Sequence, residues 1–148
     1  MISVNSEKIE HLYKIKKNCS ENIRWVSVPD SQREHLTFQV PVITLENELL
    51  YWYGYYEKNK HGFTLMFNKK YCIRSWDMAK RHYSKIEKRY VKGIGQHKHY
   101  HLDYETPRDV YSIPIGEISI SDPNKAVEDF AKECNINLTG GYQSYLFR

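Results

Sequence analysis

The sequence predicts an α+β protein with an antiparallel sheet of five to seven strands, flanked by an N-terminal and a C-terminal helix. Two observations support this. Apolar residues recur at helical spacing near both ends of the chain, whereas the middle consists of short β-branched and aromatic runs separated by turns. The chain has 148 residues, of which 41% are hydrophobic, enough for one core but short for two. We therefore expect a single domain over residues 1–148.

The chain is expected to begin with a helix followed by a short strand. Ser6 is a suitable N-cap, and Ile9 and Leu12 belong to one apolar stripe, so the spacing predicts a helix over residues 6–17. Residues 23–28 are β-branched and aromatic and end at a proline, which predicts a short strand.

Three aromatic runs predict an antiparallel meander. Residues 36–43 form a strand pattern that contains Pro41, which favours an edge strand or a bulge. Residues 49–56 are rich in aromatic residues, which favours a strand over a helix. Together with residues 63–67 they predict a hairpin. Residues 71–77 repeat the pattern and predict the next antiparallel strand.

The second half of the chain is expected to be a loop, a hairpin and a helix. Apolar spacing fades over residues 78–92, which predicts a long basic loop with at most a turn or two of helix. Residues 93–102 are expected to include a strand, and residues 109–115 its hairpin partner. Asp122 and Pro123 mark a helix start, and the helix should end near residue 135. Its predicted buried stripe is Ala126, Val127, Phe130, Ala131 and Cys134.

Composition excludes several classes of protein. No apolar run is long enough to span a membrane, and no signal-peptide pattern is present. The three cysteines are widely spaced and form no CxxC motif, so we expect a reduced cytoplasmic protein without thiol chemistry. Walker, GxSxG and HExxH motifs are absent from the sequence. We expect no cofactor.

Positive charge is concentrated in the middle of the chain. Residues 58–100 contain twelve Lys or Arg residues against Asp77 and Glu87, a formal charge of +10, whereas the whole chain carries +4. A basic segment between acidic flanks predicts an anionic partner, with RNA or DNA as the obvious class. The alternative is a solvated lysine-rich surface without a partner.

Three of the seven histidines fall at alternate positions, at His97, His99 and His101, directly after a Gly-x-Gly turn. Along a strand, alternate residues lie about 7 Å apart and share one face. Three histidines then span about 13 Å, so all three cannot bind one metal ion without a kink. A metal site would need two of them and an outside ligand such as His82, Asp77 or Asp103. Alternatively, the three histidines form a polar face of the sheet and have no chemical role.

The basic segment favours acid–base cleavage of RNA over these alternatives. Cleavage through the 2′-OH needs a base, an acid and cations near the phosphorane, and imidazoles can supply the first two without a metal. We therefore predict His97, His99 and His101 as catalytic residues and no metal ligands. Tyrosine rings can stack on bases. The predicted nucleic-acid contacts are Arg74, Lys80, Arg81, Lys85, Lys88, Arg89, Lys98, Tyr83 and Tyr100.

Two stretches of the chain carry a family resemblance, together covering residues 73–136. Arg74-Ser75-Trp76-Asp77, a His/Tyr-rich basic loop and His97-Lys98-His99 resemble the small TumE-like toxins of toxin–antitoxin systems, in which an Arg-Trp-Asp-Asn strand precedes a His-Lys-His motif. Here Met78 replaces the Asn and the loop is longer. The run Phe130-Ala131-Lys132-Glu133-Cys134-Asn135-Ile136 resembles a signature of uncharacterised phage and genomic-island proteins.

The resemblance implies a small bacterial or phage protein in growth control or phage–host conflict, with an antitoxin protein as the partner that neutralises it. Our prediction is an RNA-directed protein, a metal-independent ribonuclease of toxin type. The main alternative is a phage-encoded, non-enzymatic inhibitor that binds a host defence nucleoprotein complex of CRISPR type. A metal-dependent enzyme is the third candidate. The oligomeric state and the substrate sequence are not predicted.

Overall fold

The computed structural model describes most of the chain outside the basic segment. It describes residues 6–29, 34–58, 60–78, 81–84, 89–92, 97–101, 110–114 and 118–147. For residues 81–84, 89–92, 97–101 and 110–114, it describes the backbone. The statements below concern these residues.

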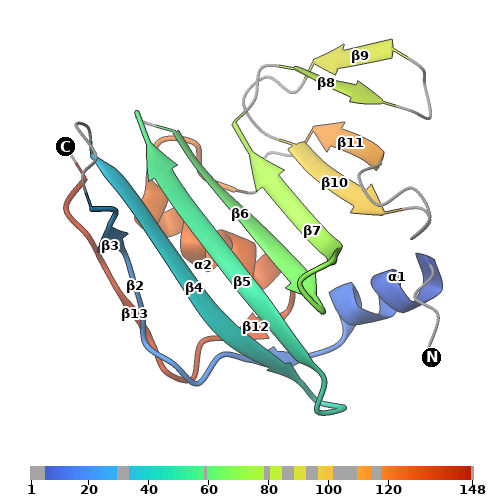
Figure 1. The fold of residues 1–148 in the computed structure, drawn as a ribbon, viewed down its shortest axis with the longest axis horizontal. Helices are drawn as coiled ribbons and strands as arrows, with labels where there is room; N and C mark the ends of the chain where they lie inside the picture. Colours follow the sequence, from blue (N-terminus) through green and yellow to red (C-terminus); the bar gives the residue numbers. More distant parts are fainter. Residues whose placement is uncertain are drawn as a thin grey trace.

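Two helices pack with one large sheet and two small ones (Figure 1). The helices are α1 (Ser6–Lys14) and α2 (Pro123–Glu133). The strands are β1 (Lys17–Asn18), β2 (Ile23–Arg24), β3 (Val26–Ser27), β4 (His35–Thr44), β5 (Leu49–Glu57), β6 (Lys60–Phe67), β7 (Tyr71–Asp77), β8 (Arg81–Ser84), β9 (Arg89–Lys92), β10 (His97–His101), β11 (Val110–Pro114), β12 (Ile136–Asn137) and β13 (Tyr142–Gln143).

The large sheet has the strand order β11-β10-β7-β6-β5-β4-β1-β12, and β3 pairs with one end of β4. The six strands from β11 to β4 form an unbroken antiparallel run. This confirms the α+β class, the terminal helices and the antiparallel meander. The large sheet is mixed and not antiparallel throughout, because β1 pairs parallel with β12 at its end. Strands β2 and β13 form a separate parallel pair.

Strand β4 shows why a proline is tolerated inside this sheet. Pro41 pairs with Tyr51 of β5 on one side. On the other side, β3 covers residues 36 and 37 and β1 covers residues 43 and 44, so Pro41 lies between these two short partners. The missing N–H of Pro41 therefore costs no ladder hydrogen bond, as expected at an edge.

The basic segment contains a hairpin where the sequence predicted a loop. Strands β8 and β9 pair antiparallel and form a two-stranded sheet of their own, outside the large one (Figure 1). The prediction of a loop with some helix over residues 78–92 is therefore wrong. Lysines and arginines occupy many positions in these strands, so the sequence lacks the usual alternation of apolar and polar residues. The backbones of the two strands pair all the same.

The hydrophobic core lies between the sheet and α2, which is behind β4, β5 and β6 in the view of Figure 1. Phe130 of α2 stacks on Trp52 at 5.6 Å and lies 5.2 Å from Phe63, measured between ring centroids. Asp122 caps the helix by accepting hydrogen bonds from two backbone N–H groups, and Pro123 occupies the first turn. All five residues of the predicted stripe of this helix are buried.

The C-terminal ends of the two helices meet at one buried lysine. Lys17 is 1% exposed, and its ammonium donates to the carbonyls of Tyr13, Ile15 and Cys134 at 2.6–2.8 Å. These carbonyls lie where helices leave acceptors unsatisfied, so one side chain caps both helices. Burial lowers the pKa of Lys17 to about 8.

One histidine of the sheet, His61, is buried. His61 of β6 is 1% exposed, its Nε2 lies 2.8 Å from the carbonyl oxygen of Ser119, and its Nδ1 finds no hydrogen-bond partner among the described residues. Burial lowers the pKa of His61, although the Ser119 carbonyl and Asp122 oppose the shift. Below its ordinary pKa of about 6.5, the unfolded chain therefore binds more protons at this site than the folded chain.

We expect the free energy of unfolding to fall as the pH drops from 7.5 to 5, and to fall less in His61→Gln, which stays neutral. Urea unfolding of both proteins at the two pH values measures the difference, and the other titrating groups cancel because both proteins share them. Equal losses in the two proteins would show that His61 is not buried in its neutral form.

No helix in the described part of the chain is long and apolar enough to cross a membrane.

Candidate nucleic-acid interface

The predicted histidine strand is an interior strand of the large sheet. β10 pairs antiparallel with β11, which confirms the predicted hairpin, and on its other side with β7. The register sets His97 opposite Asp77 and His99 opposite Ser75. The sheet thus joins the two motifs of the family resemblance, although 19 residues separate Asp77 from His97 in the chain.

The remaining predicted contact residues divide into two groups. Arg81, Tyr83, Arg89, Lys98 and Tyr100 lie on the described backbone of β8, β9 and β10. Lys80, Lys85 and Lys88 lie outside the described residues, as does the Gly-x-Gly turn at residues 93–95. The structure therefore places part of the predicted set on the basic hairpin and on the histidine strand.

Arg74 is not a surface residue. It is 1% exposed, and its guanidinium carbon lies 3.6 Å from the centre of the Tyr13 ring. The Tyr13 hydroxyl donates to Glu133, and burial together with this hydrogen bond raises the pKa of Tyr13. A guanidinium held in this interior cluster cannot contact an external phosphate. We correct the prediction for Arg74, which instead links β7 to α1.

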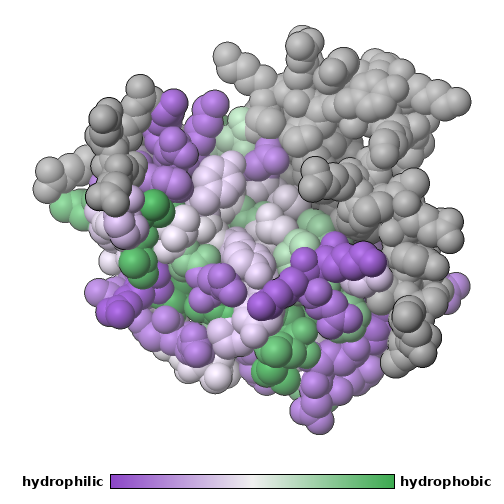
Figure 2. All heavy atoms as spheres, viewed as in Figure 1, coloured by the Kyte–Doolittle hydropathy of each residue, from purple (hydrophilic) through white to green (hydrophobic). Residues whose placement is uncertain are grey.

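Tyrosines line the face of the sheet opposite α2. Along β5, Leu50, Trp52 and Tyr56 are buried on the core face, whereas Tyr51, Tyr53 and Tyr55 alternate with them. We call these three residues, together with Thr37, Gln39 and Thr64 on the strands beside them, the tyrosine face. Figure 2 shows it, with pale residues in the middle of the view and hydrophilic ones beside them.

A groove of about 390 Å³ crosses the tyrosine face. Its walls come from β4, β5 and β6, and they combine aromatic rings with hydroxyl and amide groups. In the register, Tyr55 lies opposite Thr37, and Tyr53 lies between Gln39 and Thr64. The residues that line the groove are Thr37, Phe38, Gln39, Tyr53, Gly54, Tyr55 and Thr64.

Two rows of residues lead from the groove to the histidine strand. In the first, Tyr53 lies opposite Thr64, Thr64 opposite Ser75, and Ser75 opposite His99. The Thr64 and Ser75 hydroxyls are 3.5 Å apart. Adjacent strands are about 4.8 Å apart, so the backbones of Tyr53 and His99 are separated by about 14 Å.

The second row begins at Tyr55, whose ring lies over Gly62. A Cβ on Gly62 would come within 2.5 Å of this ring and 2.9 Å of the Trp76 carbonyl oxygen, so glycine lets the ring approach β7. Burial, and then the charges of Asp77 and Glu57, raise the pKa of Tyr55, so its hydroxyl stays protonated. Asp77, whose charge acts on Tyr55, is the next member of this row, and it lies opposite His97 in the register.

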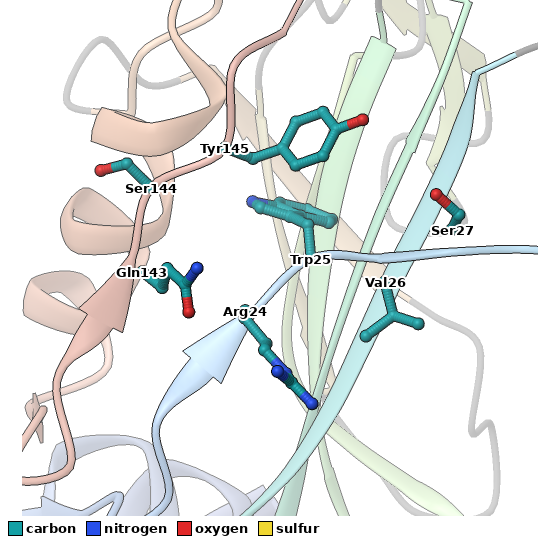
Figure 3. A pocket seen from close by; sticks show the side chains of 7 residues that line it. All are labelled: Arg24, Trp25, Val26, Ser27, Gln143, Ser144 and Tyr145. Carbon is teal, nitrogen blue, oxygen red and sulfur yellow. The ribbon is translucent and has the colours of Figure 1, made fainter.

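A second cavity, of about 340 Å³, lies far from the histidine strand. It opens between the β2–β3 segment and the C-terminal tail, beside the rings of Trp25 and Tyr145 (Figure 3). The Trp25 indole donates to the Tyr142 hydroxyl at 2.8 Å, which fixes its wall. Strands β4, β5, β6 and β7 separate β3 from β10 in the sheet, so this cavity does not adjoin the predicted catalytic strand.

The described residues offer neither a metal cluster nor a reactive thiol. No group of three His, Cys, Asp or Glu residues in this part of the chain could hold a metal ion. Burial raises the pKa of all three thiols, and those of Cys72 and Cys134 reach about 12, so the thiols stay protonated at neutral pH.

Sequence reasoning missed the tyrosine face, although the signal was present. Tyr51, Tyr53 and Tyr55 occupy alternate positions in a run already predicted to be a strand. Interpreting this run by its period of two, and not only by its aromatic content, identifies an aromatic face.

Comparisons with known proteins give no relative: no family model, no curated protein and no solved structure matches this chain.

Proposed function

We propose that this protein is a metal-independent ribonuclease of toxin type, with His97, His99 and His101 as the acid–base groups. The observation that carries the proposal is the pairing of β7 with β10, which sets His97 opposite Asp77 and His99 opposite Ser75. A carboxylate near an imidazole favours its protonated form and can orient the ring. Asp77 then supports one histidine as the acid.

The reaction requires no group from outside the chain and the RNA. One imidazole takes the proton of the 2′-OH, whose oxygen attacks the adjacent phosphorus. A second imidazole protonates the 5′-oxygen as its bond to phosphorus breaks. The products are a 2′,3′-cyclic phosphate and a 5′-hydroxyl. Arg81 and Arg89 are the cations proposed to stabilise the phosphorane. Lys98 is opposite the buried Trp76 in the register, on the other face of β10 from His97 and His99, and has no role in this step.

The test is incubation of untagged protein with total RNA, with and without a chelator. We expect cleavage to proceed at the same rate in both, because imidazoles do the proton transfer, and we expect 2′,3′-cyclic phosphate ends. A DNA strand with the sequence of one of the cleaved RNAs should stay intact because it has no 2′-OH. Loss of cleavage on chelation would favour a metal-dependent enzyme instead, and equal cleavage of DNA would exclude the proposed chemistry.

A second proposal is a non-enzymatic inhibitor that binds a nucleoprotein complex of a host defence system. The separate β8–β9 sheet favours it, because a basic hairpin outside the main sheet can contact another particle. Charge reversal at Lys85, Lys88 and Arg89 should then abolish inhibition, whereas alanine at His97 and His99 should leave it intact. Loss of activity in the alanine variant, with full activity in the charge-reversed variant, supports the ribonuclease.

A further inference from the structure

We infer that the tyrosine face binds single-stranded RNA, with one base held in the groove beside Tyr53 and Tyr55 and the strand running from there to β10. This inference rests on the proposed function for the choice of RNA and names the form of RNA that the protein selects.

The groove has the chemistry of a base-binding site. Tyrosine rings stack on bases of any sequence, and hydroxyl and amide groups can hydrogen-bond base edges. Gln39 is exposed, whereas Thr37 and Thr64 are half-buried on the strands beside the two tyrosines. These side chains supply both donors and acceptors. Tyr55, 39% exposed, keeps its hydroxyl protonated as a donor.

Lysines lie near both ends of this face, in addition to the Asp77 and Glu57 carboxylates that act on the Tyr55 hydroxyl. The ammonium of Lys69 lies 5.7 Å from the centre of the Tyr51 ring, at the end of the face near the β6–β7 turn. Lys58 and Lys60 are exposed at the opposite end of the β5–β6 hairpin. A strand that crosses the groove therefore has cations near both ends of the hairpin, as expected for phosphate contacts on either side of a stacked base.

A sheet face of this kind distinguishes single strands from duplexes. Bases in a duplex are paired and stacked on each other, so their faces cannot reach a ring on a protein surface. Bases in a single strand can leave the stack and lie on tyrosine. The row from Tyr53 through Thr64 and Ser75 to His99 then leads the backbone to the predicted catalytic strand.

The experiment measures binding without cleavage. The probe is a fluorescein-labelled 2′-O-methyl oligonucleotide of mixed sequence, which has no free 2′-OH, used as a single strand and annealed to its complement. Fluorescence anisotropy should show at least 10-fold tighter binding of the single strand by the wild-type protein. The double variant Tyr53→Ala/Tyr55→Ala should weaken this binding by about 10-fold to 100-fold, since the loss of stacking for the one base in the groove is worth about that much.

The matched control is Tyr53→Phe/Tyr55→Phe, which keeps both rings and removes only the hydroxyls, so it should bind less tightly than wild type but clearly more tightly than the alanine variant. Thermal melting checks that each variant folds, and Tyr53→Ala alone replaces the double variant if loss of the ring over Gly62 prevents folding. Equal binding by the alanine and wild-type proteins, or equal binding of duplex and single strand, overturns the inference.

Failure of this inference is distinguishable from failure of the proposed function. If wild-type protein cleaves RNA but the alanine variants bind the probe normally, the tyrosine face is not the binding site and the ribonuclease stands. If the face binds the single-stranded probe but wild-type protein cuts no RNA, the inference holds for a binding protein without nuclease activity.

Discussion

Replacing His97 or His99 by alanine should reduce RNA cleavage by about 10²-fold to 10⁴-fold, the contribution typical of a general acid or base. Removal of both should abolish cleavage. The register supports a difference between the two sites, since His97 is opposite a carboxylate, Asp77, and His99 is opposite a hydroxyl, Ser75. An imidazole beside a carboxylate is the better candidate for the acid.

The measurement is initial cleavage rate against pH for wild type and each single variant. If His97 is the acid and His99 the base, wild type should show a bell-shaped profile, and each variant should lose one limb. The matched control is His11→Ala: His11 lies on α1, contacts Glu46 in the β4–β5 turn at 2.8 Å, and should leave the rate unchanged. Full activity in a folded His97→Ala/His99→Ala protein would contradict the assignment.

Local pattern predicted much of the fold because strands β4 to β7 connect by short turns. The predicted ranges 49–56 and 71–77 agree with β5 and β7 to within a residue. The parallel pairs could not be predicted. β1 and β12 have two residues each, and they pair Lys17 near the start of the chain with Ile136 near its end. Two-residue strands carry no periodic signal, so tertiary packing alone defines them.

The candidate site was predicted less completely than the fold. The alternation of His97, His99 and His101 predicted a strand, and the backbone confirms it. The sequence could not show that β10 pairs with β7, because a hairpin, β8–β9, lies between them in the chain. Arg74 was assigned to the surface by its charge, although it is two residues from Trp76 and so shares the core face of β7.

Phe130→Ala should destabilise the protein by about 3–5 kcal/mol, the usual cost of removing a buried phenylalanine and leaving a cavity. The Phe130 side chain is fully buried and contacts the Trp52 and Phe63 rings, so it joins α2 to the middle of the sheet. The neighbouring rings are themselves packed against others, which limits how far they can close the cavity.

Urea unfolding of three variants separates this effect from a general loss of apolar surface. Phe130→Leu keeps most of the volume and should cost roughly 1–2 kcal/mol. Leu146→Ala removes an apolar side chain that is 80% exposed and should change stability by less than about 0.5 kcal/mol. A cost under 1 kcal/mol for Phe130→Ala would mean that α2 does not pack on this face. The tyrosine face, defined as the opposite side of the same strands, would then lose its structural basis as well.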